Sequence, residues 1–219
     1  AQARKKQVPP SSPWKIFGVR PGRGFGKTLS GAQWMGQAAA SDPRSYNFVI
    51  APTYDDVRYT CFQGPTGLFE VIPPPLIADC NLTLPSITLT NGSIIRGFAG
   101  DAPERLRGPQ CHRAWCDEVA SWRYPEKAWD NLIMGLRLGE RPQIFWTGTP
   151  KPKPFVTKLC KMTDVLILGS TYENSENLTD VFYENVAKYE GTKIGRQELY
   201  GELIDPEEAG FVKRSDWRL

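Results

Sequence analysis

A glycine-rich segment that ends in a lysine and a threonine carries the residue types that hold nucleotide phosphates. It consists of Pro21, Gly22, Arg23, Gly24, Phe25, Gly26, Lys27 and Thr28. Glycines let backbone N–H groups point at phosphate oxygens without a clash from Cβ. Lys27 is expected to hold the β- and γ-phosphates, and the hydroxyl of Thr28 to ligate Mg²⁺. The segment therefore predicts a site for ATP and Mg²⁺ in which residues 22–28 surround the phosphates.

The segment departs from the usual phosphate-loop pattern at one position. In G-x-x-x-x-G-K-[ST] the first glycine would be residue 21, but the chain has Pro21 there, followed by Gly22. The main role of this position is to end the preceding strand and not to donate an N–H group to phosphate. A proline there is therefore compatible with function. A glycine turn before an ordinary helix would have a similar pattern, and the loop alone leaves that alternative open.

A pair of acidic residues, Asp117 and Glu118, follows the apolar run at 112–116. Asp117 is expected to hold Mg²⁺ through water. Glu118 is expected to orient the attacking water as a general base near the γ-phosphate. An acidic pair after an apolar run is by itself more often a solvated loop. Its position about ninety residues after a phosphate loop favours the catalytic interpretation.

A second polar segment, Thr147-Gly148-Thr149, follows the apolar run at 143–146. In a parallel sheet, the carboxyl ends of adjacent strands converge on the ligand crevice. A threonine at such a position could sense the γ-phosphate, whereas a turn that only ends a strand would have the same composition. The sequence leaves both interpretations open.

The chain alternates between apolar runs and helical patterns. Strands are expected at 14–19, 47–51, 112–116, 143–146 and 164–170, and helices at 27–40, 125–138, 154–162 and 179–200. This alternation indicates an α/β fold with a largely parallel central sheet and helices on both faces.

The region between the second and third expected strands has a different character. Two alternating runs, 86–90 and 93–98, are joined by Asn91-Gly92, which predicts a β-hairpin with a type I′ turn. The proline-rich stretch at 64–87 is expected to be irregular.

The composition excludes several classes of protein. No window of the 219 residues approaches eighteen consecutive apolar residues, so no membrane span is expected. The five cysteines form no C-x-x-C pair and His112 is the single histidine, a pattern without the ligand spacing of a zinc site. The net charge of +3 permits a basic surface for nucleic acid but does not demand one.

Taken together, these motifs resemble the N-terminal ATPase domain of the large terminase subunit, the DNA-packaging motor of tailed bacteriophages. The similar residues of the arm are Arg4, Gln7, Pro9 and Pro10, and Trp14 follows them. The similar segments after it, in order, are 51–58, 64–68, 103–110, 114–118, 129–132 with 135–139, 147–150, 169–172 with 177–178, and 195–199 with 201–202. Their order along essentially the whole chain carries the resemblance.

The resemblance implies a fold and a domain organisation. The fold would be a P-loop NTPase of the ASCE, RecA-like class with the β-hairpin as an insertion. Residues 1–203 would form the ATPase domain with an N-terminal arm at 1–13. Residues 204–219 would be a linker toward a C-terminal nuclease domain that is absent from this chain, so no nuclease activity is expected.

The resemblance also implies roles that the residues alone do not give. Arg23 in the phosphate loop would contact the γ-phosphate in cis or respond to the nucleotide state. Arg107, with Arg105 as the second choice, would reach the nucleotide of a neighbouring subunit as a trans finger. Gln7 would contact adenine. Residues 147–149 match the motif that couples hydrolysis to movement.

The implied activity is ATP hydrolysis that drives double-stranded viral DNA into a procapsid. Its partners would be double-stranded DNA, further copies in a homo-oligomeric ring (a pentamer in the family), the portal and the small terminase subunit. The setting would be the cytoplasm of the bacterial host. Two alternatives remain open from the sequence: another P-loop DNA-translocating ATPase of helicase or recombination type, and a nucleotide-regulated assembly module. A GTPase is disfavoured because no Asn-Lys-x-Asp stretch is present.

Overall fold

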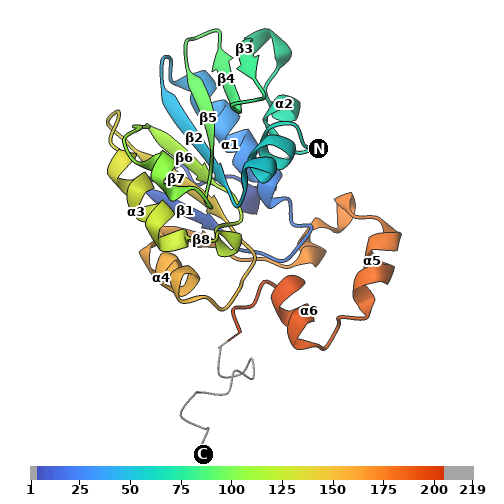
Figure 1. Ribbon diagram of the computed structural model, residues 1–219. Coiled ribbons are helices and arrows are strands. Elements are labelled where there is room, and N and C mark those ends of the chain that lie inside the picture. Colours follow the sequence, from blue (N-terminus) through green and yellow to red (C-terminus); the bar gives the residue numbers. More distant parts are fainter. Residues whose placement is uncertain (1–3, 205–219) are drawn as a thin grey trace, which may run out of the picture.

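A computed structural model describes residues 4–204 of the chain, and its centre is an eight-stranded sheet (Figure 1). The strands are β1 (Ile16–Val19), β2 (Tyr46–Ala51), β3 (Ile77–Asn81), β4 (Ser86–Leu89), β5 (Ile94–Ala99), β6 (Arg113–Cys116), β7 (Gln143–Thr147) and β8 (Val165–Ile167). Their order across the sheet is β3-β4-β5-β2-β6-β7-β1-β8. Residues 1–3 of the expected arm and nearly all of the expected linker lie outside the described residues.

Six neighbouring strands, from β5 to β8 in that order, are parallel to one another. Such strands need crossover connections, which the intervening helices provide. The α/β fold expected from the sequence is thereby confirmed, and the arrangement is that of a RecA-like P-loop protein.

The antiparallel edge of the sheet confirms one expectation and corrects two others. β4 pairs antiparallel with β5 across Asn91-Gly92, so the expected hairpin is present. The expected type I′ turn was wrong, because that turn needs positive φ at both central residues and Gly92 has one (+82°) whereas Asn91 does not. The expectation that 64–87 is irregular was wrong, because this stretch contains α2 (Leu68–Val71), a 3₁₀ turn at Pro74–Leu76 and β3. β3 is an edge strand with mostly exposed side chains. It therefore lacks the apolar alternation that identifies a strand, and main-chain pairing with β4 forms it instead.

Five longer helices surround the sheet or extend from it: α1 (Lys27–Ser41), α3 (Pro125–Gly135), α4 (Pro154–Met162), α5 (Asp180–Ala187) and α6 (Lys193–Glu198). The single helix expected at 179–200 is two helices. Gly191 between them has φ of +71°, and the hydroxyl of Thr192 caps the start of α6. A left-handed glycine ends a helix, and a new N-cap starts the next one.

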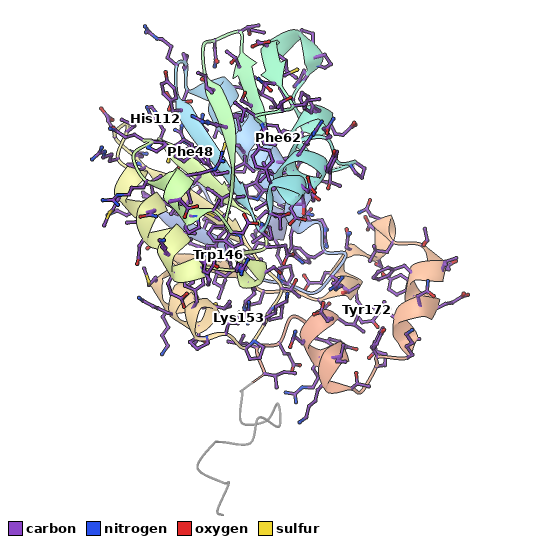
Figure 2. All side chains as sticks on the ribbon, viewed as in Figure 1. Phe48, Phe62, His112, Trp146, Lys153 and Tyr172 are labelled. Carbon is purple, nitrogen blue, oxygen red and sulfur yellow. The ribbon has the colours of Figure 1, made fainter. Side chains whose placement is uncertain are left out.

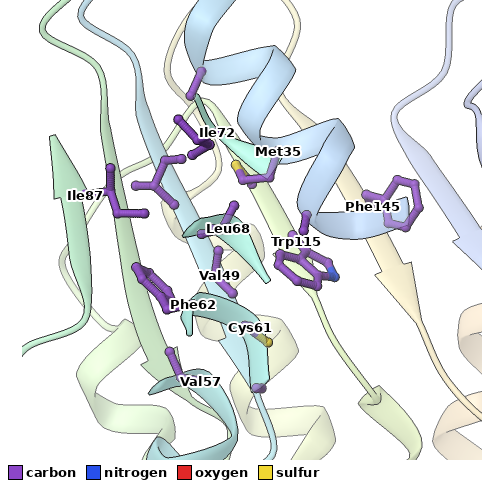
Figure 3. Packing of buried hydrophobic residues seen from close by; sticks show 14 of the residues in the cluster. Met35, Val49, Val57, Cys61, Phe62, Leu68, Ile72, Ile87, Trp115 and Phe145 are labelled. Carbon is purple, nitrogen blue, oxygen red and sulfur yellow. The ribbon is translucent and has the colours of Figure 1, made fainter. Parts of the chain in front are cut away.

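The core consists of two layers, one on each face of the sheet. Along β2, Val49 packs with the α1 layer, whereas Phe48 and Ile50 pack with the α3 and α4 layer. This alternation is what a strand that is buried on both faces requires. Figure 3 shows Trp115 of the sheet beside α1, the helix that carries Met35. Trp115, Phe145 and Met35 belong to the same buried cluster.

Residues 168–204, which we call the C-terminal segment, lie beside the sheet and apart from its two helical layers (Figure 1). Figure 2 shows Tyr172 of this segment well separated from Trp146 of the sheet. Tyr172 stacks on Tyr183, with ring centroids 5.7 Å apart. No helix in residues 4–204 is long and apolar enough to cross a membrane.

The strand order decides where the functional segments meet. β7 lies between β1, which leads into the phosphate loop, and β6, which leads into the acidic pair. All three strands are parallel, so their carboxyl ends share one edge of the sheet. Thr147 at the end of β7 is consequently placed between the phosphate loop and Asp117.

Candidate active site

The phosphate loop connects β1 to α1, and two of its glycines have a left-handed backbone. φ is +72° at Gly24 and +91° at Gly26, values that glycine adopts without the steric cost of Cβ. Left-handed residues that alternate with ordinary ones turn successive N–H groups toward one side, which makes a concave site for an anion. α1 starts at Lys27, so the positive end of its dipole lies at the same site.

The loop and the acidic pair meet through Lys27 and Glu118. Nζ of Lys27 lies 3.3 Å from Oε1 of Glu118, and the lysine is buried. The expected convergence of these two motifs is thereby confirmed. In this arrangement the cation predicted to hold phosphate neutralises the carboxylate predicted to act as base.

Thr147 and Thr149 bind both acidic residues. Oγ1 of Thr147 donates to Oδ1 of Asp117 at 2.7 Å and accepts the N–H of Glu118 at 3.0 Å. The N–H and Oγ1 of Thr149 donate to Oε2 of Glu118 at 3.1 and 3.0 Å. The N–H of Gly148 donates to the last carbonyl of β1 at 3.2 Å. These contacts make the segment part of the site and more than a turn that ends a strand.

Glu118 is held in an uncommon backbone conformation. Its φ is +47°, a left-handed value that costs a residue with Cβ about 1–2 kcal/mol. Burial favours the neutral carboxyl, but the charge of Lys27 and the two hydrogen bonds from Thr149 outweigh burial, so the pKa of Glu118 lies below its usual value. Glu118 is therefore ionised at neutral pH, as a general base must be.

Asp117 has the opposite electrostatic environment. It is 3% exposed, and burial followed by the charge of Glu118 raises the pKa of Asp117 to about 7, although Thr147 and Lys27 favour ionisation. A bound cation would stabilise the charged form of this carboxylate. Thr28, on the first turn of α1, supplies a hydroxyl of the type that Mg²⁺ accepts. Asp117 and Thr28 thus supply oxygen ligands of the kind that the Mg²⁺ site expected from the sequence requires.

Two residues contact Asp117 although no sequence motif predicts that they do. Nε1 of Trp122 donates to the main-chain carbonyl of Asp117 at 2.9 Å. Sγ of Cys61 lies 3.9 Å from Oδ2 of Asp117. Cys61 belongs to a π-helix (Asp56–Phe62) far away in sequence, and no local pattern predicts that it reaches the acidic pair.

The first residues of the loop face the C-terminal segment. The N–H of Gly22 donates to the carbonyl of Gly169 at 3.0 Å, and the N–H of Arg23 to that of Glu198 at 2.6 Å. The guanidinium of Arg23 pairs with the carboxylate of Glu198, and this contact raises the pKa of Arg23. The contact with γ-phosphate expected of Arg23 stays a prediction. The main-chain donors that remain for phosphate begin at Gly24.

Phe25 and Gln7 occupy the other side of the loop. The ring of Phe25 is fully buried in the α1 layer, which leaves its main chain for the ligand. Nε2 of Gln7 donates to the carbonyl of Phe25 at 3.1 Å, and Oε1 of Gln7 accepts the N–H of Arg4 at 2.9 Å. Gln7 therefore lies beside the loop, and its contact with adenine stays a prediction.

Arg105 and Arg107 lie on a 3₁₀ turn (Pro103–Leu106) and directly after it. Both are exposed. Arg107 lines a small pocket of about 200 Å³ together with Met134 and Arg137 beside α3. Within residues 4–204 neither arginine forms an ion pair with Glu118 of its own chain, whose partner is Lys27. A role for Arg107 or Arg105 in trans stays a prediction.

Comparison with known proteins identifies the family of this chain. A family model described as the terminase large subunit, T4likevirus-type, N-terminal, matches residues 21–217. The chain belongs to the terminase large subunit family. The resemblance found in the sequence is thereby confirmed, and this membership connects the chain with bacteriophage DNA packaging. No curated protein sequence gives a significant match.

Solved terminase structures share the fold. The large terminase ATPase domain of Thermus phage P74-26 is 17% identical, with a TM-score of 0.68 over 89% of this chain and 90% of that chain. The large terminase of a thermophilic bacteriophage in complex with ADP is 14% identical, with a TM-score of 0.67 over 87% of this chain and 48% of that chain. Another structure of that second terminase contains ATP-γ-S and has a TM-score of 0.63, at 13% identity, over 87% of this chain and 47% of that chain. The chain thus spans about half the length of the second terminase.

Proposed function

We propose that this terminase chain hydrolyses ATP with Mg²⁺ and that hydrolysis drives double-stranded viral DNA into a procapsid. The observation that carries the proposal is the network in which Thr147 and Thr149 join Asp117 and Glu118, beside Lys27 and the phosphate loop. The ADP and ATP-γ-S complexes of a structural relative support a nucleotide as the ligand.

The geometry supports a specific role for Glu118. Oε1 of Glu118 pairs with Lys27, whereas Oε2 is held by Thr149. A nucleotide phosphate carries more negative charge than a carboxylate and competes for the same lysine. When Lys27 turns to phosphate, Oε1 becomes available to take a proton from water, and Thr149 keeps the carboxylate in place.

Asp117 and Thr28 would hold Mg²⁺, which neutralises charge on the phosphates when it is bound. Thr147 fixes one oxygen of Asp117 and the N–H of Glu118 at once. A movement of Asp117 or Glu118 on phosphate binding or release would therefore also move residues 147–149, and with them the end of β7. This connection supports a coupling role for Thr147, Gly148 and Thr149.

The remaining elements of the proposal concern the assembly. Arg23 contacts or reports the γ-phosphate in cis, and Arg107 of a neighbouring copy completes the site in a homo-oligomeric ring, with Arg105 as the second choice. Support comes from the exposure of Arg105 and Arg107 and from family membership. Double-stranded DNA, the portal and the small terminase subunit are the proposed partners, in the cytoplasm of the bacterial host.

The first experiment measures phosphate release from ATP at high protein concentration, with and without Mg²⁺. We expect Mg²⁺-dependent release that is lost in Lys27→Ala and in Glu118→Ala. Full activity of Glu118→Ala would remove Glu118 as the base. No release from the wild-type chain, together with measurable ADP binding, would favour a nucleotide-regulated assembly module.

The second experiment tests the trans finger by mixing Arg107→Ala with Glu118→Ala subunits. Each variant alone is expected to lose about 10³-fold or more in turnover. In the mixture, some interfaces combine an intact Glu118 with an intact Arg107, so activity should partly return. A mixture as inactive as its two components would exclude the trans role of Arg107. The same mixing with Arg105→Ala then tests the second choice.

A further inference from the structure

Three consecutive carbonyl groups of the phosphate loop accept hydrogen bonds from side chains outside the loop. The donors to the first two carbonyls are Oγ1 of Thr171, which binds the carbonyl of Arg23 at 2.6 Å, and Nδ2 of Asn174, which binds the carbonyl of Gly24. The carbonyl of Phe25 accepts from the side chains of both Arg4 and Gln7.

These bonds determine which way the neighbouring N–H groups point. A trans peptide group is planar, so the C=O of one residue and the N–H of the next point in opposite directions, and the described chain has no cis peptide bond. Carbonyls 23, 24 and 25 are turned toward their donors, so the N–H groups of Gly24, Phe25 and Gly26 are turned away from them. None of these three N–H groups donates to another main-chain group of residues 4–204.

The two donors in the C-terminal segment are themselves fixed. Thr171 and Asn174 belong to a 3₁₀ segment (Thr171–Asn177) and are buried, at 0% and 8% exposure. The N–H of Thr171 donates to the carbonyl of Leu199 at 2.7 Å, and Oδ1 of Asn174 accepts Nδ2 of Asn177 at 3.0 Å. Buried polar side chains with satisfied partners hold a defined rotamer.

We propose that Thr171 and Asn174 are positioning residues for phosphate binding, which hold the loop carbonyls outward so that the following N–H groups stay presented to the ligand. Neither residue touches the nucleotide in this proposal, and each acts through the loop backbone. The proposal rests on the proposed function in that the ligand is a nucleotide. It adds that the C-terminal segment, through two side chains, sets the affinity for phosphate.

The binding test uses the isosteric pair Thr171→Val and Thr171→Ser, because valine removes the hydroxyl and serine keeps it. We expect Thr171→Val to bind ADP and inorganic pyrophosphate each about 3- to 10-fold more weakly, as the loss of one hydrogen bond implies. Thr171→Ser should stay close to wild type. Thr157→Val, on the exposed side of α4, is the matched control and should change neither affinity.

Asn174→Asp is the second variant, because it keeps the shape but replaces the amide donor with an oxygen. Asn174→Asp should reduce the affinity for ADP and for pyrophosphate at least as much as Thr171→Val does. Unchanged affinity for both ligands in Thr171→Val and Asn174→Asp would overturn the proposal. Weaker ADP binding with unchanged pyrophosphate binding would also overturn it, because the effect would then lie on the nucleoside side.

A measurement without nucleotide separates this proposal from the proposed function. The carbonyl held by Thr171 belongs to the Arg23–Gly24 peptide bond, which trypsin cleaves. In the nucleotide-free protein, Thr171→Val should raise the rate of this cleavage several-fold relative to cleavage after Arg44, and Thr171→Ser should not. Equal rates in all three proteins would contradict the positioning role, whereas a wild-type chain that binds no ADP would contradict only the proposed function.

Discussion

The two halves of the site are built in different ways. The acidic half, with Asp117, Glu118 and Thr147, stands on central parallel strands, and Thr147 is fully buried. The loop half takes its shape from the arm and from the C-terminal segment, whose helix α5 has no buried residue. Elements with few buried contacts open locally at low free energy. We therefore expect the acidic half to keep its geometry, and the loop half to change conformation more easily.

Substitution of Glu118, the expected general base of the acidic half, should give the largest loss of activity. Glu118→Gln keeps the shape but cannot accept a proton, so we expect kcat for ATP hydrolysis to fall about 10²- to 10⁴-fold. ADP affinity should not fall, because the substitution removes only the carboxylate that competes with phosphate for Lys27. A parallel loss of ADP affinity would show that the two halves are not separable in this way.

Removing the link inside the acidic half should cost stability. Thr147→Val leaves the buried N–H of Glu118 and one oxygen of Asp117 without their partner, which costs about 1–3 kcal/mol. Urea unfolding measures this difference, and Thr147→Ser is the matched control that restores the hydroxyl. Thr171→Val breaks a single hydrogen bond in the loop half. A loss of stability as large as that of Thr147→Val would show that the two halves are held equally firmly.

A smaller effect is expected at the ion pair between the loop and the C-terminal segment. The side chain of Arg23 is 70% exposed and that of Glu198 18%, so solvent screens the pair and Glu198→Gln should cost about 0.5 kcal/mol or less. The difference from wild type should shrink in 1 M NaCl. A cost that is large and insensitive to salt would show that the loop half is held as firmly as the acidic half.

The smallest effect is expected at Asp164, which belongs to neither half. Its carboxylate accepts the N–H groups of Lys15 and Ile16 at 2.7 and 2.8 Å, and these bonds lower the pKa of Asp164. A lowered pKa means that the stabilisation is present above pH ~4 and is lost as pH falls through the folded-state pKa. Since Asp164 is exposed, Asp164→Asn should cost only about 0.3 kcal/mol at pH 7, with no difference at pH 2. Unfolding curves at the two pH values check the sign.

The acidic half was largely predictable from the sequence, because it depends on local patterns. An apolar run before Asp117 and another before Thr147 predict buried parallel strands, and parallel strands bring their carboxyl ends together. The geometry confirms that Lys27, Glu118 and Thr149 meet. The hairpin at Asn91-Gly92 was predictable for the same reason, since its signal lies within a few residues.

The supports of the loop half could not be predicted from local patterns. Thr171, Asn174 and Glu198 reach the loop through contacts between residues 148 to 175 positions apart, and a polar side chain in a 3₁₀ segment does not show its distant acceptor. Cys61 beside Asp117 was missed because a π-helix has no sequence pattern comparable to helical or strand periodicity. β3 was missed because its strand pairing, and not its burial, defines it.

The contacts that shape the phosphate loop also bear on the order of folding. The loop lies near the start of the chain, whereas Thr171 and Glu198 lie near the end of the described residues, so the loop-closure entropy of these contacts is paid late. The sheet and its two helical layers do not need the C-terminal segment for their own contacts. Until that segment docks, the carbonyls of Arg23 and Gly24 lack the hydrogen bonds from Thr171 and Asn174. Because Thr171 and Asn174 hold the loop carbonyls, a ligand that binds the loop more tightly in this state also stabilises the docking of the C-terminal segment.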